Sequence, residues 1–352
     1  DVQRAFEQVR PLCHPRTRLI LNFYNSLWQW PLTLVQRLGL ATPLLPQNWL
    51  TIEDVNNMLR LAGFEAIRAW QEVLWPLPLG GLANRLLIRL WPFYHFALAN
   101  FLIARPAPQP SETPPRVSII IPARNEAGNI AAIFERMPQM GRETELIFVE
   151  GHSRDSTFEV IQAEIAAHPR TPSRLLRQSG IGKADAVRLG FAHARGDILM
   201  ILDADLTVPP EDLPRFYQAL VSGQGEFING VRLVYPMEGQ AMRTLNFLGN
   251  KFFSAAFTWL LGQPIKDTLC GTKALWRSDY ERIVAQRNYF GDFDPFGDFD
   301  LLFGAARQNL KIIDLPIRYR ERTYGQTNIS RWKHGLLLMK MVAFAARRLK
   351  FI

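Results

Sequence analysis

The sequence predicts an α/β protein whose largest domain is built on a mostly parallel sheet. Short runs such as VSIII at 117–121 and ELIFV at 145–149 are almost entirely apolar, which is typical of strands buried on both faces. These runs alternate with segments of helical periodicity, as in a sheet that is covered by helices on both sides. The length of 352 residues favours two domains over one.

The predicted elements follow one another from residue 117 onward. We expect strands at 117–121, 145–149, 198–202 and 226–231, and helices at 129–137, 156–167, 183–194 and 210–221. Residues 104–116 (ARPAPQPSETPPR) contain five prolines among polar residues, which is typical of a linker. The predicted division is therefore a segment at 1–106, a linker at 107–115, a domain at 116–329 and a C-terminal helix at 330–352.

The net charge of +9 is concentrated at the C-terminal end. Residues 304–352 contain eleven Lys and Arg but only two acidic residues. Such a basic end favours anionic lipid or phosphate-bearing substrates, and since no nucleic-acid-binding motif accompanies it we expect no nucleic acid partner. The two cysteines, Cys13 and Cys270, form no C-x-x-C pair, which excludes a disulfide framework and a cysteine-based zinc site.

Two carboxylates, Asp203 and Asp205, stand directly after the predicted strand at 198–202. Because ligands bind beyond the carboxyl ends of parallel strands, the loops at 122–126, 150–155 and 203–207 should converge at one edge of the sheet. Two Asp at i and i+2 can hold Mg²⁺ or Mn²⁺ and so neutralise a leaving diphosphate. The alternative for an isolated D-x-D pair is a solvated loop whose Asp caps a helix.

Six motifs, in the same order, resemble those of the family-two glycosyltransferases of the GT-A fold, and more narrowly the dolichyl-phosphate mannosyl- and glucosyltransferases. They are IPARNE (121–126), EGHSRDST (150–157), IGKADAVRLGFAHARGDILMILDADL (181–206), NGVR (229–232), IKDTLCGTKALWR (265–277) and RTYGQTNISRW (322–332). The resemblance implies a GT-A fold and a metal-dependent, inverting transfer of a hexose. The implied donor is a UDP- or GDP-hexose, and the implied acceptor is a polyprenyl phosphate.

The resemblance also implies roles for individual residues. Donor binding falls to Pro122, Glu126, Glu150, Asp155, Asp203, Ala204, Arg232 and Arg322, and the metal ion to Asp203 and Asp205. Arg243 and Lys251 would bind the acceptor phosphate, while Asp267, Asp298 and Asp300 are candidates for orienting the acceptor or accepting a proton. The chain departs from the family pattern at Gly151, where a second acid is usual, and at Thr207 and Asn328.

Two flanking segments complete the chain. On a helix from about Ser330, the side chains of Lys333, Lys340 and Arg347 recur every seven residues, which is typical of an amphipathic helix at the cytoplasmic face of a membrane; a helix docked on the domain is the alternative. Residues 16–30, 48–79 and 99–104 resemble the second half of a class I SAM-dependent methyltransferase. The glycine-rich cofactor loop of that fold is absent, so we expect no methyl transfer.

Two other functions stay open from the sequence alone. The same fold could use a glycan hydroxyl as the acceptor, or the chain could be a non-catalytic scaffold that binds a sugar nucleotide. The paired Asp and Arg residues favour catalysis over the scaffold.

Overall fold

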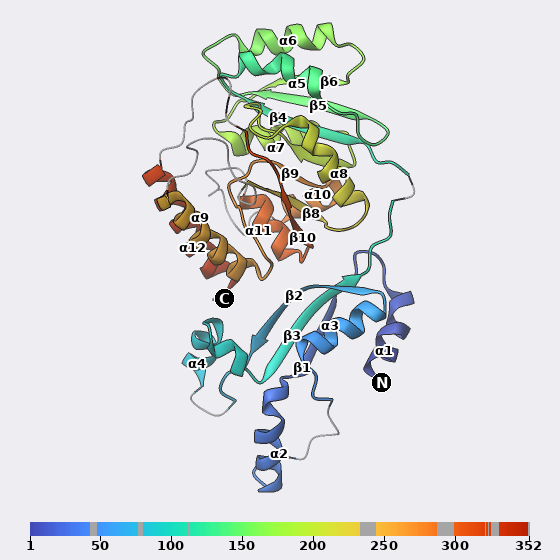
Figure 1. Cartoon of the computed structure of the whole chain (residues 1–352), viewed down its shortest axis with the longest axis vertical. Helices are drawn as coiled ribbons and strands as arrows, with labels where there is room; N and C mark the ends of the chain where they lie inside the picture. The colour runs from blue at the N-terminus through green and yellow to red at the C-terminus, as the bar shows by residue number, and fades with distance from the viewer. Residues whose placement is uncertain are drawn as a thin grey trace. The chain divides into compact units, whose positions relative to one another are not determined.

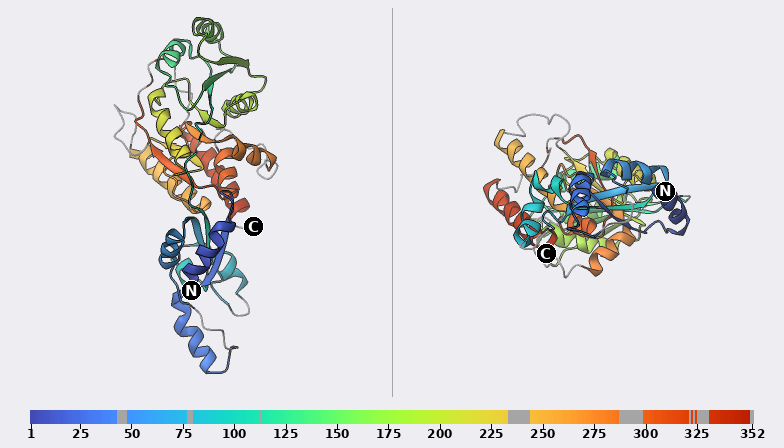
Figure 2. Two further views of the ribbon diagram at one scale, coloured as in Figure 1. Left: turned by 90° about the vertical axis from the view of Figure 1, so that its right-hand side faces the viewer. Right: turned by 90° about the horizontal axis from the view of Figure 1, so that it is seen from below.

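The computed structural model describes residues 1–42, 48–76, 80–111, 113–232, 244–286, 299–320, 322, 324 and 331–350. The chain forms two compact units: unit 1 comprises residues 1–108 and 346–352, and unit 2 comprises residues 109–345. The division at Pro108 lies within the predicted linker. Each unit has a sheet of its own, that of unit 1 drawn in blue and cyan in Figures 1 and 2.

Unit 2 is built on a seven-stranded sheet of order β10-β8-β9-β7-β4-β5-β6. The strands are β4 (Val117–Ala123), β5 (Thr144–Glu150), β6 (Ser173–Arg177), β7 (Ile198–Ile201), β8 (Phe227–Val231), β9 (Lys273–Trp276) and β10 (Ile312–Pro316). Strand β9 is antiparallel to its neighbours β7 and β8, while the other strand pairs of the described sheet are parallel. The predicted α/β architecture with a mostly parallel sheet is therefore confirmed.

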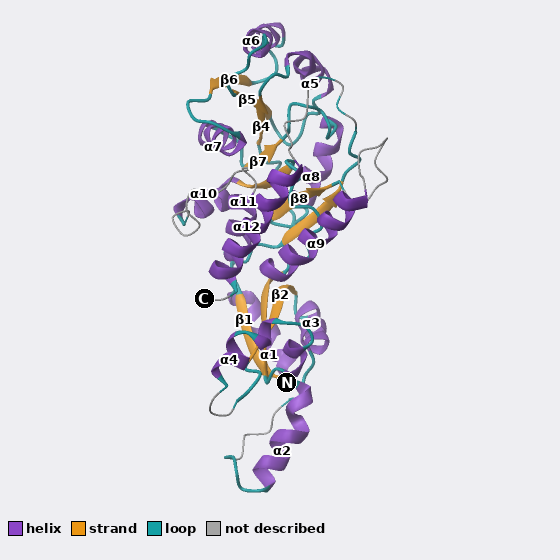
Figure 3. Cartoon of the chain, turned by 90° about the vertical axis from the view of Figure 1, so that its left-hand side faces the viewer, coloured by secondary structure: helices purple, strands orange, loops and turns teal. Residues whose placement is uncertain are grey.

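Helices cover both faces of this sheet (Figure 3). They are α5 (Ile130–Arg136), α6 (Thr157–Ala167), α7 (Lys183–His193), α8 (Leu213–Val221), α9 (Thr244–Leu261), α10 (Arg277–Ala285), α11 (Phe299–Arg307) and α12 (Arg331–Leu349). Successive side chains of β4 point to opposite faces of the sheet, so their contacts show which face each helix covers. Ile119 and Ile121 join one core with α5 and α8, whereas Ile120 contacts Gly190 of α7 on the other face.

The C-terminal helix α12 begins close to the residue expected from the sequence. Leu338, Met341 and Ala345 are buried, so one apolar face of this helix is covered by protein. Lys340 and Arg347, by contrast, are exposed. The expected membrane contact of this helix stays a prediction. Among the described helices, none combines the length and the apolar character needed to cross a bilayer.

Unit 1 contains a three-stranded antiparallel sheet of order β1-β3-β2. Its elements are α1 (Val2–Val9), β1 (Leu19–Tyr24), α2 (Gln29–Arg37), α3 (Ile52–Leu61), β2 (Phe64–Glu72), α4 (Gly81–Arg85), η3 (Leu87–Arg89), η4 (Phe93–Phe96) and β3 (Ala99–Pro106). Phe6, Leu59, Phe64 and Leu102 centre its core. The strands lie at the positions predicted from the methyltransferase resemblance, which itself stays a prediction.

A polar network joins β4 and β5 to the turn before β7. The backbone N–H of Gly196 donates to Ser118 Oγ at 2.7 Å, and the Ser118 hydroxyl donates to the Glu145 carboxylate. Glu145 also accepts from the backbone N–H of Arg195 at 2.6 Å. Since Ser118 is fully buried and Glu145 nearly so, these bonds satisfy groups that would otherwise destabilise the sheet.

Gly196→Ala should lower the free energy of unfolding by about 1–3 kcal/mol, because it overpacks this network. A Cβ at this position would lie 2.5 Å from both the backbone N and the Oγ of Ser118. Gly249→Ala in α9 is the matched control, since no heavy atom lies within 4 Å of its added Cβ. It should leave stability unchanged or raise it by up to about 1 kcal/mol. Equal losses in denaturant titrations of the two variants would contradict this account of the packing.

Candidate active site

The loops that follow β4, β5 and β7 surround a cavity of about 680 Å³ at the carboxyl edge of the sheet. All three predicted loops contribute: Pro122, Arg124 and Glu126 from the first, Gly151 and His152 from the second, and Asp203, Ala204 and Asp205 from the third. The shared register of the three strands explains the convergence, since Ile120 pairs with both Ile147 and Ile201. The volume is within the usual range for a small-molecule site.

Asp203 forms an ion pair with Lys183, the first residue of α7. The distance from Lys183 Nζ to Asp203 Oδ1 is 2.5 Å. Burial raises the pKa of Asp203, but the Lys183 ammonium outweighs it, so the pKa lies below its usual value. Gly271 fits closely over the pair, because a Cβ there would be 2.1 Å from Asp203 Oδ2 and from Lys183 Nζ. The glycine of the CGTK motif is thus required for this arrangement.

Asp205 is held by groups from two segments far apart in the sequence. Arg322 Nη2 donates to Asp205 Oδ2 at 2.6 Å. On the other side, the hydroxyl and the backbone N–H of Thr207 donate to Asp205 Oδ1 at 2.7 and 3.1 Å. Thr207 therefore orients the carboxylate of the D-x-D pair.

Glu126 shares Arg322 with Asp205. Arg322 Nη1 donates to Glu126 Oε1 at 3.2 Å, and Asn129 donates to the other carboxylate oxygen at 2.7 Å. Burial raises the pKa of Glu126 to about 7; Arg322 opposes the rise, while the nearby charge of Asp205 adds to it. This carboxyl can therefore change its protonation state near neutral pH.

The donor set fits a divalent ion only in part. Within the described ranges, no three His, Cys, Asp or Glu side chains lie together in a way that could hold a metal ion. Asp203 and Asp205 supply two carboxylates, and each already faces a cation. Magnesium and manganese are commonly bound by one or two carboxylates together with water and substrate phosphates. The two Asp therefore fit a metal ion whose remaining ligands come from a bound diphosphate.

Four predicted residues do not line the cavity but support its walls. Glu150 accepts from the backbone N–H of Ser153 at 2.5 Å, which shapes the loop after β5. Asp155 accepts from Thr157 at the start of α6 and from the N–H of Ala127. The other two, Arg232 and Asp267, form a two-pronged ion pair, described next.

The ion pair of Arg232 and Asp267 lies behind the cavity. Arg232 Nε and Nη2 donate to the two oxygens of Asp267 at 2.7 and 2.9 Å. Burial raises the pKa of Asp267, yet the Arg232 guanidinium holds it below its usual range. Both oxygens of Asp267 are thus engaged by Arg232, and its expected role toward the acceptor stays a prediction.

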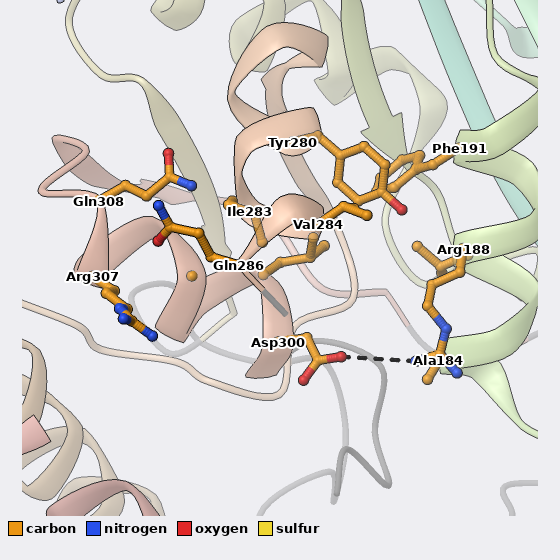
Figure 4. A pocket seen from close by; sticks show the side chains of 13 residues that line it. Ala184, Arg188, Phe191, Tyr280, Ile283, Val284, Gln286, Asp300, Arg307 and Gln308 are labelled. Carbon is orange, nitrogen blue, oxygen red and sulfur yellow. Dashed lines mark ion pairs between the residues drawn. The ribbon is translucent and has the colours of Figure 1, made fainter. Parts of the chain in front are cut away.

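The remaining predicted residues lie elsewhere. Asp300, on α11, lines a second pocket between α7, α10 and α11, where it pairs with Arg188 at 3.7 Å (Figure 4). Lys251 is exposed on α9. Arg243 and Asp298 fall outside the described residues, as does Asn328. Lys251 is therefore not among the residues that line the cavity.

Sequence reasoning assigns no role to several residues that line the cavity, among them Lys183, Gln178 and His152. Lys183 was named as a residue of the IGKADA motif only, although it pairs with Asp203. Gln178 follows β6, a strand that was not predicted; its amide donates to the Gly182 carbonyl at 2.7 Å. His152 lies with φ at 59° and contacts the Gly180 carbonyl at 3.0 Å. His152 and Lys183 lie in motifs that carry the family resemblance, whereas Gln178 has no comparable signal in the sequence.

Comparison with known proteins agrees with this geometry. Residues 118–284 match the model of glycosyl transferase family 2. This part of the chain is therefore similar to a family 2 glycosyltransferase. All of the cavity residues except Arg322 lie within the matched range.

Several relatives of this glycosyltransferase domain have names that describe sugar transfer. Undecaprenyl-phosphate 4-deoxy-4-formamido-L-arabinose transferase of Edwardsiella ictaluri is 28% identical, and the match covers 63% of this chain and 63% of the relative. The protein of the same name from Aeromonas hydrophila is 32% identical with the same coverage. Glycosyltransferase AglJ of Haloferax volcanii is 29% identical over 63% of this chain and 69% of its own length.

Among solved structures, glucosyl-3-phosphoglycerate synthase of Mycobacterium tuberculosis in complex with Mg²⁺ and UDP is similar at a TM-score of 0.49 and 19% identity. That match covers 67% of this chain and 79% of the synthase. A likeness at this level carries no weight for function.

Glu126→Gln should change how stability depends on pH. The pKa of Glu126 rises from 4.5 to about 7 on folding, so between these values the unfolded chain loses a proton that the folded chain keeps. Folding stability is therefore lost as the pH rises through this window, and glutamine, which stays neutral, escapes the loss. The Tm of the variant should rise relative to the parent by a few degrees from pH 5.5 to pH 8.5.

Glu211→Gln is the control for this titration. Its pKa is lowered, first by the hydrogen bond from Arg136, so its contribution should not change above pH 5.5. A Tm difference for Glu126→Gln that stays flat over the same range, like that of the control, would refute the raised pKa.

Proposed function

We propose that the chain transfers a sugar from a nucleotide diphosphate donor to a polyprenyl phosphate at the cytoplasmic face of a membrane. The observation that carries the proposal is the Asp203–Asp205 pair in a 680 Å³ cavity, with each carboxylate held by a cation. The names of the undecaprenyl-phosphate transferases support this acceptor class. The sequence resemblance favours a hexose, whereas those relatives are named for a substituted arabinose, so both belong in the donor panel.

Donor binding follows from the charges in the cavity. Asp203 and Asp205 would hold Mg²⁺ or Mn²⁺, which supplies positive charge to the leaving diphosphate. Lys183 and Arg322 face the same two carboxylates and can donate to phosphate oxygens once these compete for them. The planar guanidinium of Arg322 suits this task, since it makes two parallel hydrogen bonds. Pro122 and Glu126, on the other wall, would contact the nucleoside.

The acceptor explains why no strong base is required. A phosphate oxygen is already a nucleophile at neutral pH, so positioning contributes more than proton removal. This agrees with the engagement of Asp267 by Arg232, which leaves it no free oxygen. A hydroxyl acceptor would instead require a carboxylate free to take its proton. Attack from the side opposite the diphosphate would invert the anomeric carbon.

Asp205→Asn should reduce sugar transfer by roughly a hundredfold or more, because it removes one of the two carboxylates that face the diphosphate. The measurement is the transfer of radiolabelled sugar from UDP- and GDP-linked donors to a product extractable into organic solvent. Asp212→Asn is the matched control, since Asp212 directly precedes α8, does not line the cavity and pairs with Arg215. It should transfer at the parent rate.

The same experiment separates the alternatives. If the label appears only in water-soluble glycans, the acceptor is a glycan hydroxyl and not a polyprenyl phosphate. Nucleotide binding without any transfer would support the scaffold and overturn the proposal.

A further inference from the structure

Unit 1 exposes a group of large apolar side chains on the segment that joins β2 to β3. Six residues of this segment are between 37% and 75% exposed: Leu86, Leu87, Leu90, Trp91, Phe93 and Phe96. Trp75, nearer the start of the same segment, is 49% exposed. We call these seven residues the α4–η4 surface. Seven large apolar side chains exposed to water on one segment are energetically unfavourable, so they indicate a site of contact.

The α4–η4 surface is held in place by hydrogen bonds. Asn84 accepts from the backbone N–H of Trp75 at 2.7 Å and donates to its carbonyl at 2.8 Å. Trp28 Nε1 donates to the Phe96 carbonyl at 2.9 Å, and Asn25 donates to the carbonyl of Ala97 at 2.9 Å. Ile88 is only 1% exposed, so its side chain packs into the protein and fixes the segment. The apolar side chains are thus presented outward by an ordered backbone.

The charges around this surface are mostly positive, and Glu72 of β2 pairs with Arg89 at 3.9 Å. Residues 80–98 contain Arg85 and Arg89 but no Asp or Glu. Lys350 belongs to the same unit, and the guanidinium groups of Arg68 and Arg89 repel its ammonium group. Burial and these two guanidinium groups lower the pKa of Lys350 to about 8, with Glu72 as the opposing acid. Arg68 Nε is buried without a hydrogen-bond partner in the structure. Such a cluster is stabilised by an anion.

We propose that the α4–η4 surface docks on an anionic lipid bilayer, with its Trp, Phe and Leu side chains in the interface and Arg68, Arg89 and Lys350 at the headgroup phosphates. Tryptophan and phenylalanine beside arginine are the composition that the bilayer interface favours. A protein partner would have to bring a complementary apolar surface as well as carboxylates, whereas an anionic bilayer supplies an apolar interior and phosphate groups together. This docking is consistent with the proposed polyprenyl acceptor, but it is tested without it.

Vesicle flotation of the full chain tests the proposal. The chain should float with vesicles of phosphatidylglycerol and phosphatidylcholine, and less with phosphatidylcholine alone.

The triple variant Leu90→Ser, Trp91→Ser, Phe96→Ser should bind on the order of a hundredfold more weakly, because three interfacial anchors are removed. In the double variant Arg89→Gln, Lys350→Gln, the affinity for the anionic vesicles should fall roughly fivefold for each charge removed. Its affinity for phosphatidylcholine vesicles should not change. The control Leu12→Ser, Leu61→Ser changes two leucines that are at least 61% exposed, one after α1 and one at the end of α3, and should float like the parent.

Two readouts keep this proposal apart from the proposed function. Asp205→Asn should still float, and the triple variant should still transfer sugar to a short-chain, water-soluble prenyl phosphate. The proposal is overturned if the parent does not float, or if the triple variant floats as well as the parent. Light scattering that detects a dimer of the parent, lost in the triple variant without any change in flotation, would assign the surface to a second copy of the chain.

Discussion

Two carboxylates at the end of a buried strand need partners of opposite charge, and this requirement organises the site. Asp203 and Asp205 lie where the sheet interior meets the cavity, and Lys183 and Arg322 neutralise them. The cations come from the first turn of α7 and from the segment after β10, so the pairs tie distant parts of unit 2 to one edge of the sheet. An unpaired charge at this depth would be costly, which is why each carboxylate has its own cation.

The same cations make the cavity suitable for a diphosphate. Each of them can exchange a carboxylate for a phosphate oxygen, and a divalent ion held by Asp203 and Asp205 would then compensate the two carboxylates. Glu126 adds a carboxyl whose pKa lies near 7 and whose charge therefore responds to what binds beside it. The glycine at 271 allows the close approach of Lys183 and Asp203 that this exchange requires.

Hydrophobic patterns within short segments predicted the strands and helices whose formation depends mainly on neighbouring residues. The strands at 117–121, 145–149 and 198–202 are continuous apolar runs, and parallel topology alone then brought their following loops together. Strand β9 was missed, because its place between β7 and β8 depends on pairing across some 70 residues and on an antiparallel direction. Arg232 and Asp267 were each identified, but their ion pair was not, since 35 residues separate them and no spacing rule connects them. The identity of the cation at Asp203 was missed for the same reason.

The central claim is that the two Asp carboxylates and a bound diphosphate together form the metal site. Electron paramagnetic resonance of Mn²⁺ tests it directly, because the signal of the free aquo ion falls as the ion is bound. We expect the chain to take up about one Mn²⁺ when UDP or GDP is present and little in its absence, since two carboxylates alone hold the ion weakly. Equal uptake with and without nucleotide, or full uptake by an Asp203→Asn, Asp205→Asn double variant, would contradict the account.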